Sequence, residues 1–265
     1  MQREVVAAYD AISGEYDRQV EGDQWMRQVL WAHYKRIFRP GQRVLDIACG
    51  TGIDTIFLAQ QGVQVTALDL APGMIAQLQT KLASQQLAGQ VEAHVMDFAA
   101  LASWPPETFD GIISSFAGLN TVPDLRPFAA NAAHVLRPGG HLVVHLLNGF
   151  SLWEWLGLLW RGQWRKARHL GQEPERTFLI GGQHVRHYLF FPDDAYRRFF
   201  SPAFHLRGAY GLGILRPPHS VRRIPSPVVA ALHGLERRLH SRRPFIRWGR
   251  FFVLDLEKRG TGYER

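Results

Sequence analysis

Five short apolar runs alternate with helix-length segments over the first 150 residues, and this alternation constrains the fold more than any other feature. The runs cover residues 43–48, 63–68, 90–96, 109–115 and 141–147. Short, continuous apolar runs are typical of strands that are buried on both faces. The intervening segments have the length of crossover helices, which join parallel strands in a right-handed sense. The sequence therefore predicts an α/β fold around a parallel sheet.

The rhythm changes after residue 150. Ser151 and Glu154 have the spacing of a capping box and predict the start of a helix. Residues 176–191 read as a β-hairpin with a turn at Gly181 and Gly182. The remaining expected elements are helices at 24–38, 192–200 and 227–239 (the first and last amphipathic), strands at 204–212 and 250–259, and a proline-rich loop at 215–227 that we expect over a pocket mouth.

We expect three parts along the chain. Residues 1–148 form the core that binds a ligand, and residues 149–203 form a cap or lid of a helix and a hairpin. Residues 204–265 supply the last two strands of the core, with a helical cap segment inserted between them. The fold class is thus an α/β sheet with helices on both faces and a C-terminal cap insertion.

Cysteine content and hydropathy limit the class of protein. Cys49 is the single cysteine, which excludes an internal disulfide framework and a multi-cysteine metal site. No apolar run approaches the roughly 18 residues of a membrane-spanning helix. The N-terminal residues lack a signal pattern, so we expect a cytoplasmic protein.

The net charge of +8 is unevenly distributed. Residues 1–160 contain 10 Lys and Arg against 15 Asp and Glu, whereas residues 161–265 contain 21 against 8. The C-terminal part is therefore strongly basic. This charge fits an anionic substrate, an acidic membrane surface, nucleic acid, or only a solvated face.

The stretch "VLDIACGTGIDT" (44–55) places Asp46 before a glycine turn at Gly50 and Gly52. A dinucleotide fingerprint requires a third glycine, where this chain has Thr55. A phosphate beside Asp46 would also be repelled, by about 1–4 kcal/mol at ~4 Å. The turn is therefore a poor phosphate cradle and suits a cationic ligand better.

Two further carboxylates follow expected strands. Asp69 ends the second strand, where it could accept bonds from both hydroxyls of a ribose. Asp97 follows the third strand and could accept from an adenine amino group, with Met96 and Phe98 beside the ring. Ligands of open α/β sheets bind at the carboxyl ends of strands, where all these residues lie.

The ordered set "VLDIACGTG", "ALDLAPGMI", "MDF", "FDGIISSFAGLNTVPDL" and "LRPGG" resembles the class I S-adenosylmethionine-dependent methyltransferases, in their small-molecule branch (methyltransferase types 11 and 25). The resemblance implies a Rossmann-like sheet of seven strands in the order 3-2-1-4-5-7-6, with strand seven antiparallel. It implies S-adenosylmethionine as cofactor, S-adenosylhomocysteine as product, and no metal. The cofactor-binding residues that it implies are Tyr16, Asp46, Ala48, Gly50, Gly52, Asp69, Leu70, Met74, Asp97, Phe98 and Ser115.

Catalytic residues are not identified by the sequence. Tyr16 lies in an aromatic N-terminal segment that the family places over the cofactor, and an aromatic face beside a sulfonium stabilises it by roughly 0.5–2 kcal/mol. Tyr16 could equally pack on the sheet edge. His145 ends the fifth strand and is a weak candidate, or a structural histidine. The expected substrate-pocket residues are Phe116, Asn120, Asn148 and Trp153.

The cap favours an apolar acceptor, because four tryptophans fall between residues 153 and 164. We therefore expect S-adenosylmethionine-dependent methylation of a small, largely apolar molecule. Residues 151–168 also have the composition of a helix at a membrane interface, or of a lid packed on its own domain. The alternatives are an RNA methyltransferase that uses the basic part and a non-catalytic cofactor-binding module. The RNA alternative lacks the Pro-Pro-aromatic turn after strand four, so a nucleic-acid partner is not expected.

Overall fold

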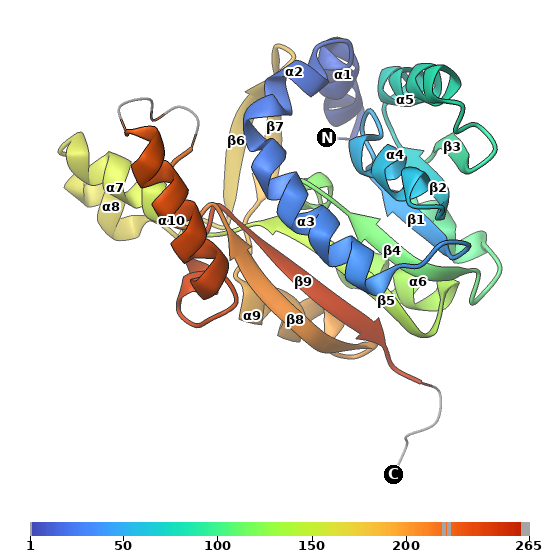
Figure 1. Cartoon of the computed structure of the whole chain (residues 1–265). Coiled ribbons are helices and arrows are strands. Elements are labelled where there is room, and N and C mark those ends of the chain that lie inside the picture. The colour runs from blue at the N-terminus through green and yellow to red at the C-terminus, as the bar shows by residue number, and fades with distance from the viewer. Residues whose placement is uncertain (1, 219–220, 222–223, 261–265) are drawn as a thin grey trace.

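A sheet of seven strands in the order β3-β2-β1-β4-β5-β9-β8 forms the centre of the protein (Figure 1). The computed structural model describes residues 2–218, 221 and 224–260. Strands β1 to β5 are parallel, and β9 runs antiparallel to both β5 and β8. The sixth and seventh strands of this sheet are thus β8 and β9, and the predicted order is confirmed. The strands are β1 (Arg43–Ile47), β2 (Gln64–Asp69), β3 (Val91–Val95), β4 (Phe109–Ser114), β5 (Leu136–Leu147), β8 (Phe204–Leu212) and β9 (Phe251–Lys258).

Helices cover both faces of the sheet because alternate strand residues are buried on opposite sides. Val44 and Ile113 join one apolar cluster, whereas Leu45 and Ile112 join the other. The first cluster packs under α3 (Gln24–Ile37), α4 (Ile53–Gln60) and α5 (Pro72–Gln85). The second packs against η2 (Phe98–Ser103), α6 (Arg126–Val135) and the segment formed by α9 (Pro192–Ala195) and η4 (Tyr196–Phe200).

Strand β5 begins earlier than the sequence indicated. The expected strand covered 141–147, but pairing with β4 already starts at Leu136, opposite Phe109. The register then shifts before Gly111 pairs with His141. Residues 137–140 therefore form an irregular part of the strand, between its two paired stretches.

Three helices and a hairpin extend from one end of the sheet (Figure 1). They are α7 (Leu152–Trp160), α8 (Trp164–His169), α10 (Ser226–Leu239) and the pair β6 (Glu175–Ile180) and β7 (Gln183–Tyr188). The predicted helix start is confirmed, since Ser151 is the N-cap of α7, but the capping box does not form: the Ser151 side chain makes no cap hydrogen bond, and Glu154 pairs with Arg176. The apolar face predicted for α10 is not buried either, since Val228 and Leu235 are both exposed.

The N-terminal helix α1 (Gln2–Ile12) lies over the upper edge of the sheet and is held from two sides (Figure 1). The backbone N–H of Gly73, in the first turn of α5, donates to Asp10 at 2.7 Å. The hairpin turn packs on the other side, where a Cβ atom added to Gly181 would lie 2.3 Å from the carbonyl oxygen of Ala8. Helix α2 (Tyr16–Val20) and η1 (Glu21–Asp23) then lead into α3.

Two expectations concern the loop at 215–227 and the absence of a membrane-spanning helix. The predicted loop over a pocket mouth, 215–227, includes residues 219–220 and 222–223, which lie outside the described residues. Among the residues that are described, no helix has the length and apolar content needed to cross a bilayer. The cytoplasmic location stays a prediction.

Candidate cofactor pocket

A pocket opens at the carboxyl ends of β1, β2 and β4, directly under α1. Eight of the eleven residues expected to bind a cofactor line it. They are Tyr16, Ala48, Gly50, Asp69, Leu70, Met74, Phe98 and Ser115. Phe116, expected at the acceptor site, lines it as well. Asp46, Gly52 and Asp97 are not among the lining residues.

The turn after β1 is built from three residues in the left-handed region. Ala48, Gly50 and Gly52 have φ values of 55°, 57° and 77°. Gly52 is required for packing as well, since a Cβ atom there would lie 2.2 Å from Leu78 of α5. Its role is therefore to let α4 and α5 approach, whereas Gly50 lies at the pocket itself.

Asp69 is fixed by the turn that it faces. One carboxylate oxygen accepts the backbone N–H of Gly50 at 2.8 Å, and the other accepts the N–H of Ala71 at 2.9 Å. Burial raises the pKa of the Asp69 carboxyl, and these two N–H groups act against that rise. A carboxylate has about four acceptor positions, so two remain for the hydroxyl groups of a ligand.

The pocket is weakly anionic. Among the described residues that line it, Asp69 carries the only charged side chain, and the other lining groups are apolar, aromatic or hydroxyl-bearing. The rings of Tyr9 and Tyr16 both line the pocket, and burial raises the pKa of each phenol. Both tyrosines are therefore neutral near pH 7. The charge of the pocket therefore favours a cationic ligand over a phosphate.

Asp46 lies behind the pocket rather than in it. Its side chain is 1% exposed and accepts the hydroxyl of Thr55 at 2.6 Å. Burial is the main cause that raises the pKa of Asp46, to about 8, with Asp54 and Asp69 acting in the same direction. Thr55, which replaces the third glycine of a dinucleotide fingerprint, is thus the partner of this buried carboxyl.

Asp97 is occupied by the N-terminal helix. Gln2 donates its side-chain amide to one carboxylate oxygen, and the other oxygen accepts the backbone N–H of Ala99. A primary amide donor therefore lies where an adenine amino group is expected. With α1 in this position the cavity volume is about 90 Å³, below the roughly 300–1,000 Å³ of pockets that enclose small ligands. A bound nucleoside requires the Gln2 end of α1 to move outward.

A buried ion pair supports the wall of the pocket. The guanidinium of Arg27 pairs with Asp54, and both side chains are less than 5% exposed. Asp54 also accepts the indole N–H of Trp31 at 2.7 Å. The Arg27 guanidinium lies 4.0 Å from the ring centre of Phe116, which lines the pocket. Arg27 was not singled out from the sequence, where it is one arginine in an amphipathic helix.

His145 lies behind Phe116, with their ring centres 4.6 Å apart. The backbone N–H of Phe116 donates to Nδ1 of His145 at 3.0 Å, so the proton of the neutral ring is on Nε2. Burial, with smaller contributions from Arg27 and Arg250, lowers the pKa of His145 to about 3. The basic lone pair of this histidine is therefore already used, and Nε2 is buried with no partner among the described residues.

The other expected acceptor residues are placed in three different ways. Asn120 is fully buried and ties the hairpin to the sheet, because its amide donates to the carbonyl of Tyr188 and accepts the N–H of Leu147. Asn148 is buried and donates to the carbonyl of Ile246. Trp153 lines a different cavity, described below. Of these three, none lines the cofactor pocket.

Six lining residues were not expected from the sequence. Val5 and Tyr9 come from α1, Ile47 and Leu68 from β1 and β2, and Gly118 and Thr121 from the turn after β4. A signal existed for Gly118, because the turn reads "FAGLN" and a Cβ atom there would lie 2.4 Å from that of Ala48. No metal-binding group of three or more His, Cys, Asp or Glu side chains occurs among the described residues.

Residues 44–140 match the family described as "Methyltransferase domain". The chain is 37% identical over 113 residues to a ubiquinone biosynthesis O-methyltransferase of Xanthomonas campestris, covering 43% of this chain and 46% of that protein. It is 32% identical over 148 residues to a demethylmenaquinone methyltransferase of Clavibacter sepedonicus, covering 53% and 57%. The chain spans only about half the length of these relatives.

Solved structures agree over more of the fold. An S-adenosylmethionine-dependent methyltransferase described as putative, from Listeria monocytogenes, superposes with a TM-score of 0.59 at 16% identity, covering 87% of this chain and 96% of that one. The 1,6-didemethyltoxoflavin-N1-methyltransferase of Burkholderia thailandensis, solved with S-adenosylhomocysteine, gives 0.55 at 21% identity and 97% and 88% coverage. The fold is that of a Rossmann-like methyltransferase. Residues 44–140 are the part of the chain that matches the methyltransferase family in sequence.

Proposed function

We propose that the protein transfers the methyl group of S-adenosylmethionine to a small, largely apolar molecule. One observation carries this proposal: the backbone N–H of Gly50, which a phosphate-binding turn would present to its ligand, donates to Asp69. The pocket thus presents a carboxylate where a nucleotide would need a donor. A sulfonium nucleoside meets favourable charge in the same place.

Different residues of the pocket bind different parts of the cofactor. Asp69 accepts the ribose hydroxyls, while Met74 and Phe98 supply apolar surface at the base. Tyr16 and Phe116 place aromatic rings on the side away from the base, where they favour a cation and exclude water. When bound, S-adenosylmethionine supplies an activated methyl group, so the chain's main tasks are alignment and a dry site.

The reaction needs no base from His145, whose Nδ1 accepts a backbone N–H. Tyr16 is neutral, and its ring contributes more than its hydroxyl. The printed names of two relatives refer to ubiquinone biosynthesis and to demethylmenaquinone, which supports a small apolar acceptor for this chain.

Fractionation of a methylation reaction tests the proposal. Purified protein is incubated with methyl-labelled S-adenosylmethionine and a cell extract, and label is then counted in the organic-soluble, RNA and protein fractions. We expect label in the organic-soluble fraction and none with the Asp69→Ala variant. Label in RNA would establish the nucleic-acid alternative, and binding without transfer to any fraction would establish the non-catalytic one.

We also propose that α7 and α8 contact an anionic membrane surface. Trp160 and Trp164 are 91% and 67% exposed, and basic residues accompany them at 161, 165, 166 and 168. Indole rings with flanking arginines are typical of helices at a lipid interface. The protein should sediment with vesicles containing phosphatidylglycerol but not with phosphatidylcholine alone. Sedimentation of a Trp160→Asp/Trp164→Asp variant as efficiently as wild type would contradict this contact.

A further inference from the structure

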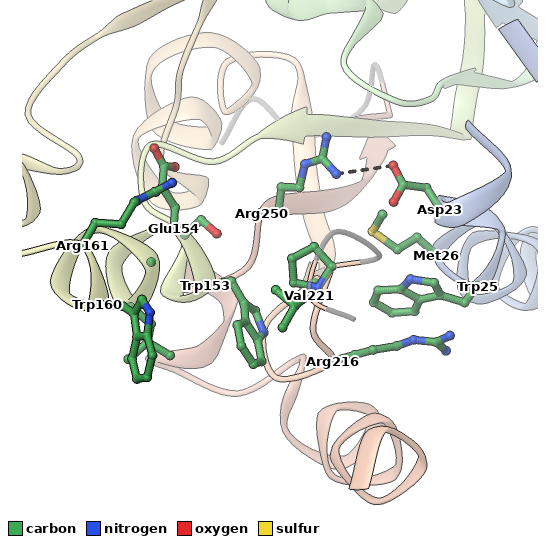
Figure 2. A pocket seen from close by; sticks show the side chains of 15 residues that line it. Asp23, Trp25, Met26, Trp153, Glu154, Trp160, Arg161, Arg216, Val221 and Arg250 are labelled. Carbon is green, nitrogen blue, oxygen red and sulfur yellow. Dashed lines mark hydrogen bonds and ion pairs between the residues drawn. The ribbon is translucent and has the colours of Figure 1, made fainter. Parts of the chain in front are cut away.

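A second cavity, a groove with a volume of about 800 Å³, opens beside the cofactor pocket at the same end of the sheet (Figure 2). Its walls come from four separate segments. Trp25 and Met26 belong to α3, Trp153 and Trp160 belong to α7, and the other two segments are the loop after β8 and the residue before β9, Arg250. None of these segments contributes to the cofactor pocket.

The tryptophan walls of the groove are held in place by the loop of residues 213–216. The indole N–H of Trp153 donates to the carbonyl of Leu215 at 3.2 Å. The guanidinium of Arg216 lies 4.7 Å from the ring centre of Trp25. The loop therefore connects the two aromatic walls, and Figure 2 shows Trp25 and Trp153 on opposite sides of it.

This loop is itself anchored by Glu236 of α10, which is 2% exposed. Its carboxylate accepts the backbone N–H groups of four successive residues, 213 to 216, at 2.8–3.2 Å. Buried carboxylates with this many donors are rigid. Glu236 therefore fixes the loop that forms the floor of the groove.

The charges in the groove do not cancel. Asp23 pairs with Arg250 at 3.4 Å, and Glu154 pairs with Arg176 at 2.5 Å, so both lining carboxylates have partners (Figure 2). Arg161 and Arg216 have no carboxylate within ion-pair distance among the described residues. Burial lowers the pKa of Arg216, and the nearby Glu236 acts against that change. The charged side chains that line the groove, among the described residues, are thus three arginines and two carboxylates, and Arg216 lies against an aromatic wall.

We propose that this groove is a second binding site, for an amphipathic molecule with an apolar body and one anionic group. The apolar body would lie between Trp25, Trp153 and Trp160, and its carboxylate or phosphate would meet Arg216, which lies beside Trp25 (Figure 2). The groove opens toward Trp160, which is 91% exposed, so the ligand enters from the α7 side.

The groove is a separate site because the two cavities share no lining residue, and aromatic rings lie between them. The guanidinium of Arg250 lies 4.9 Å from the ring centre of Phe251, which lies 5.9 Å from that of Phe116. Phe116 faces the cofactor pocket. The proposal therefore does not depend on methyl transfer, and ligand binding here is measured without S-adenosylmethionine.

Calorimetric titration with dodecanoate tests the site, below the concentration at which dodecanoate forms micelles. Dodecanol and dodecyltrimethylammonium share its apolar body but carry no negative charge. We expect one dodecanoate to bind per chain, about tenfold or more tightly than either comparison compound, because charge-assisted hydrogen bonds contribute about 1.5–3 kcal/mol. Equal affinities for the three compounds, or no binding of dodecanoate, would overturn the proposal.

Two groove variants and one control variant test whether dodecanoate binds in the groove. Arg216→Gln should weaken dodecanoate binding about tenfold while leaving dodecanol binding unchanged. Trp153→Ala, which removes one aromatic wall of the groove, tests the site if the first variant folds poorly, and it should weaken the binding of dodecanoate and dodecanol alike. Arg238→Gln, on α10 but not among the groove residues, is the matched control and should bind as wild type. Wild-type affinity in both groove variants contradicts the assignment, whatever the cofactor experiments show.

Discussion

The two cavities at the end of the sheet differ in charge, in size and in the way the chain builds them. The cofactor pocket encloses about 90 Å³, and its one charged lining residue is Asp69. The groove encloses about 800 Å³, and its charged lining side chains, among the residues that the structure describes, are three arginines and two carboxylates. The pocket is closed by a helix, whereas the groove is open toward exposed tryptophans.

One end of the sheet can therefore bind two ligands of opposite charge, because aromatic rings lie between the two cavities. The partition consists of Phe116, His145 and Phe251, packed with ring centres 4.6–5.9 Å apart. Arg27 stacks on Phe116 and is neutralised by Asp54, so its charge belongs to neither cavity. The Arg27→Leu variant tests the partition, and variants of Asp69, Asp46 and Gln2 test the cofactor pocket.

The largest effect is expected from Arg27→Leu, which removes one partner of the buried pair. Asp54 would keep an uncompensated buried charge, and the free energy of unfolding should fall by about 3–5 kcal/mol in urea denaturation. Arg250→Leu, in the more exposed pair with Asp23, is the control and should lose less than about 1 kcal/mol. Adding Asp54→Asn to Arg27→Leu should recover part of the loss. Equal losses in the two single variants would contradict the partition's role.

Asp69→Ala separates the two cavities most cleanly. Loss of two ligand bonds to a carboxylate should weaken S-adenosylmethionine binding about 100-fold or more in calorimetry. Dodecanoate binding to the groove should stay at the wild-type level. Asp124→Ala, at an exposed carboxylate near α6, is the control for both ligands. Wild-type affinity for S-adenosylmethionine in Asp69→Ala would remove the ribose assignment.

Asp46→Asn tests how much the buried carboxyl behind the pocket contributes to the pH dependence of folding stability. The folded-state pKa of about 8 lies above the ordinary value of 3.8, so the folded protein holds a proton that the unfolded chain releases. Wild-type stability should therefore decline as pH rises from about 4 toward 8 through this group. Asparagine keeps the oxygen that accepts from Thr55 but does not titrate. Relative to wild type, the variant should gain at least about 1 kcal/mol between pH 5 and pH 8, measured by thermal denaturation. A constant difference would show that Asp46 does not titrate in this range.

The smallest effect is expected at α1, the helix that covers the cofactor pocket. Gln2 donates to Asp97, the acceptor expected for an adenine amino group. Gln2→Ala should strengthen S-adenosylmethionine binding roughly 2- to 10-fold, because a competing hydrogen bond of about 0.5–1.5 kcal/mol is lost. Gln60→Ala, which removes an exposed amide pair on α4, should have no effect. Weaker binding in Gln2→Ala would mean that Gln2 supports the ligand.

The cofactor pocket was largely predictable because its residues follow consecutive strands. Gly50, Asp69 and Phe98 are each found by locating a strand end, and parallel strands bring their carboxyl ends together. The exceptions are informative. Gly52 serves the packing of Leu78, and Asp46 serves a buried bond to Thr55, so neither contacts the pocket. A motif fixes the backbone path but does not say which of its residues faces the ligand.

The groove could not be predicted in the same way. Trp25, Trp153 and Arg216 belong to segments far apart in the chain, and no local pattern relates them. Burial of Glu236 under four backbone N–H groups runs against the amphipathic pattern of its helix, which gave no reason to bury a carboxylate. Tertiary contacts of this kind follow from loop geometry rather than from sequence periodicity.

The central claim is that the pocket under α1 accepts a positively charged nucleoside and rejects a phosphorylated one. Calorimetric titration of the wild-type protein with S-adenosylmethionine, ATP and NAD at matched concentration and ionic strength tests it most directly. The account predicts one S-adenosylmethionine bound per chain and no binding heat from ATP or NAD. Saturable binding of ATP or NAD, with S-adenosylmethionine giving no heat, would contradict it.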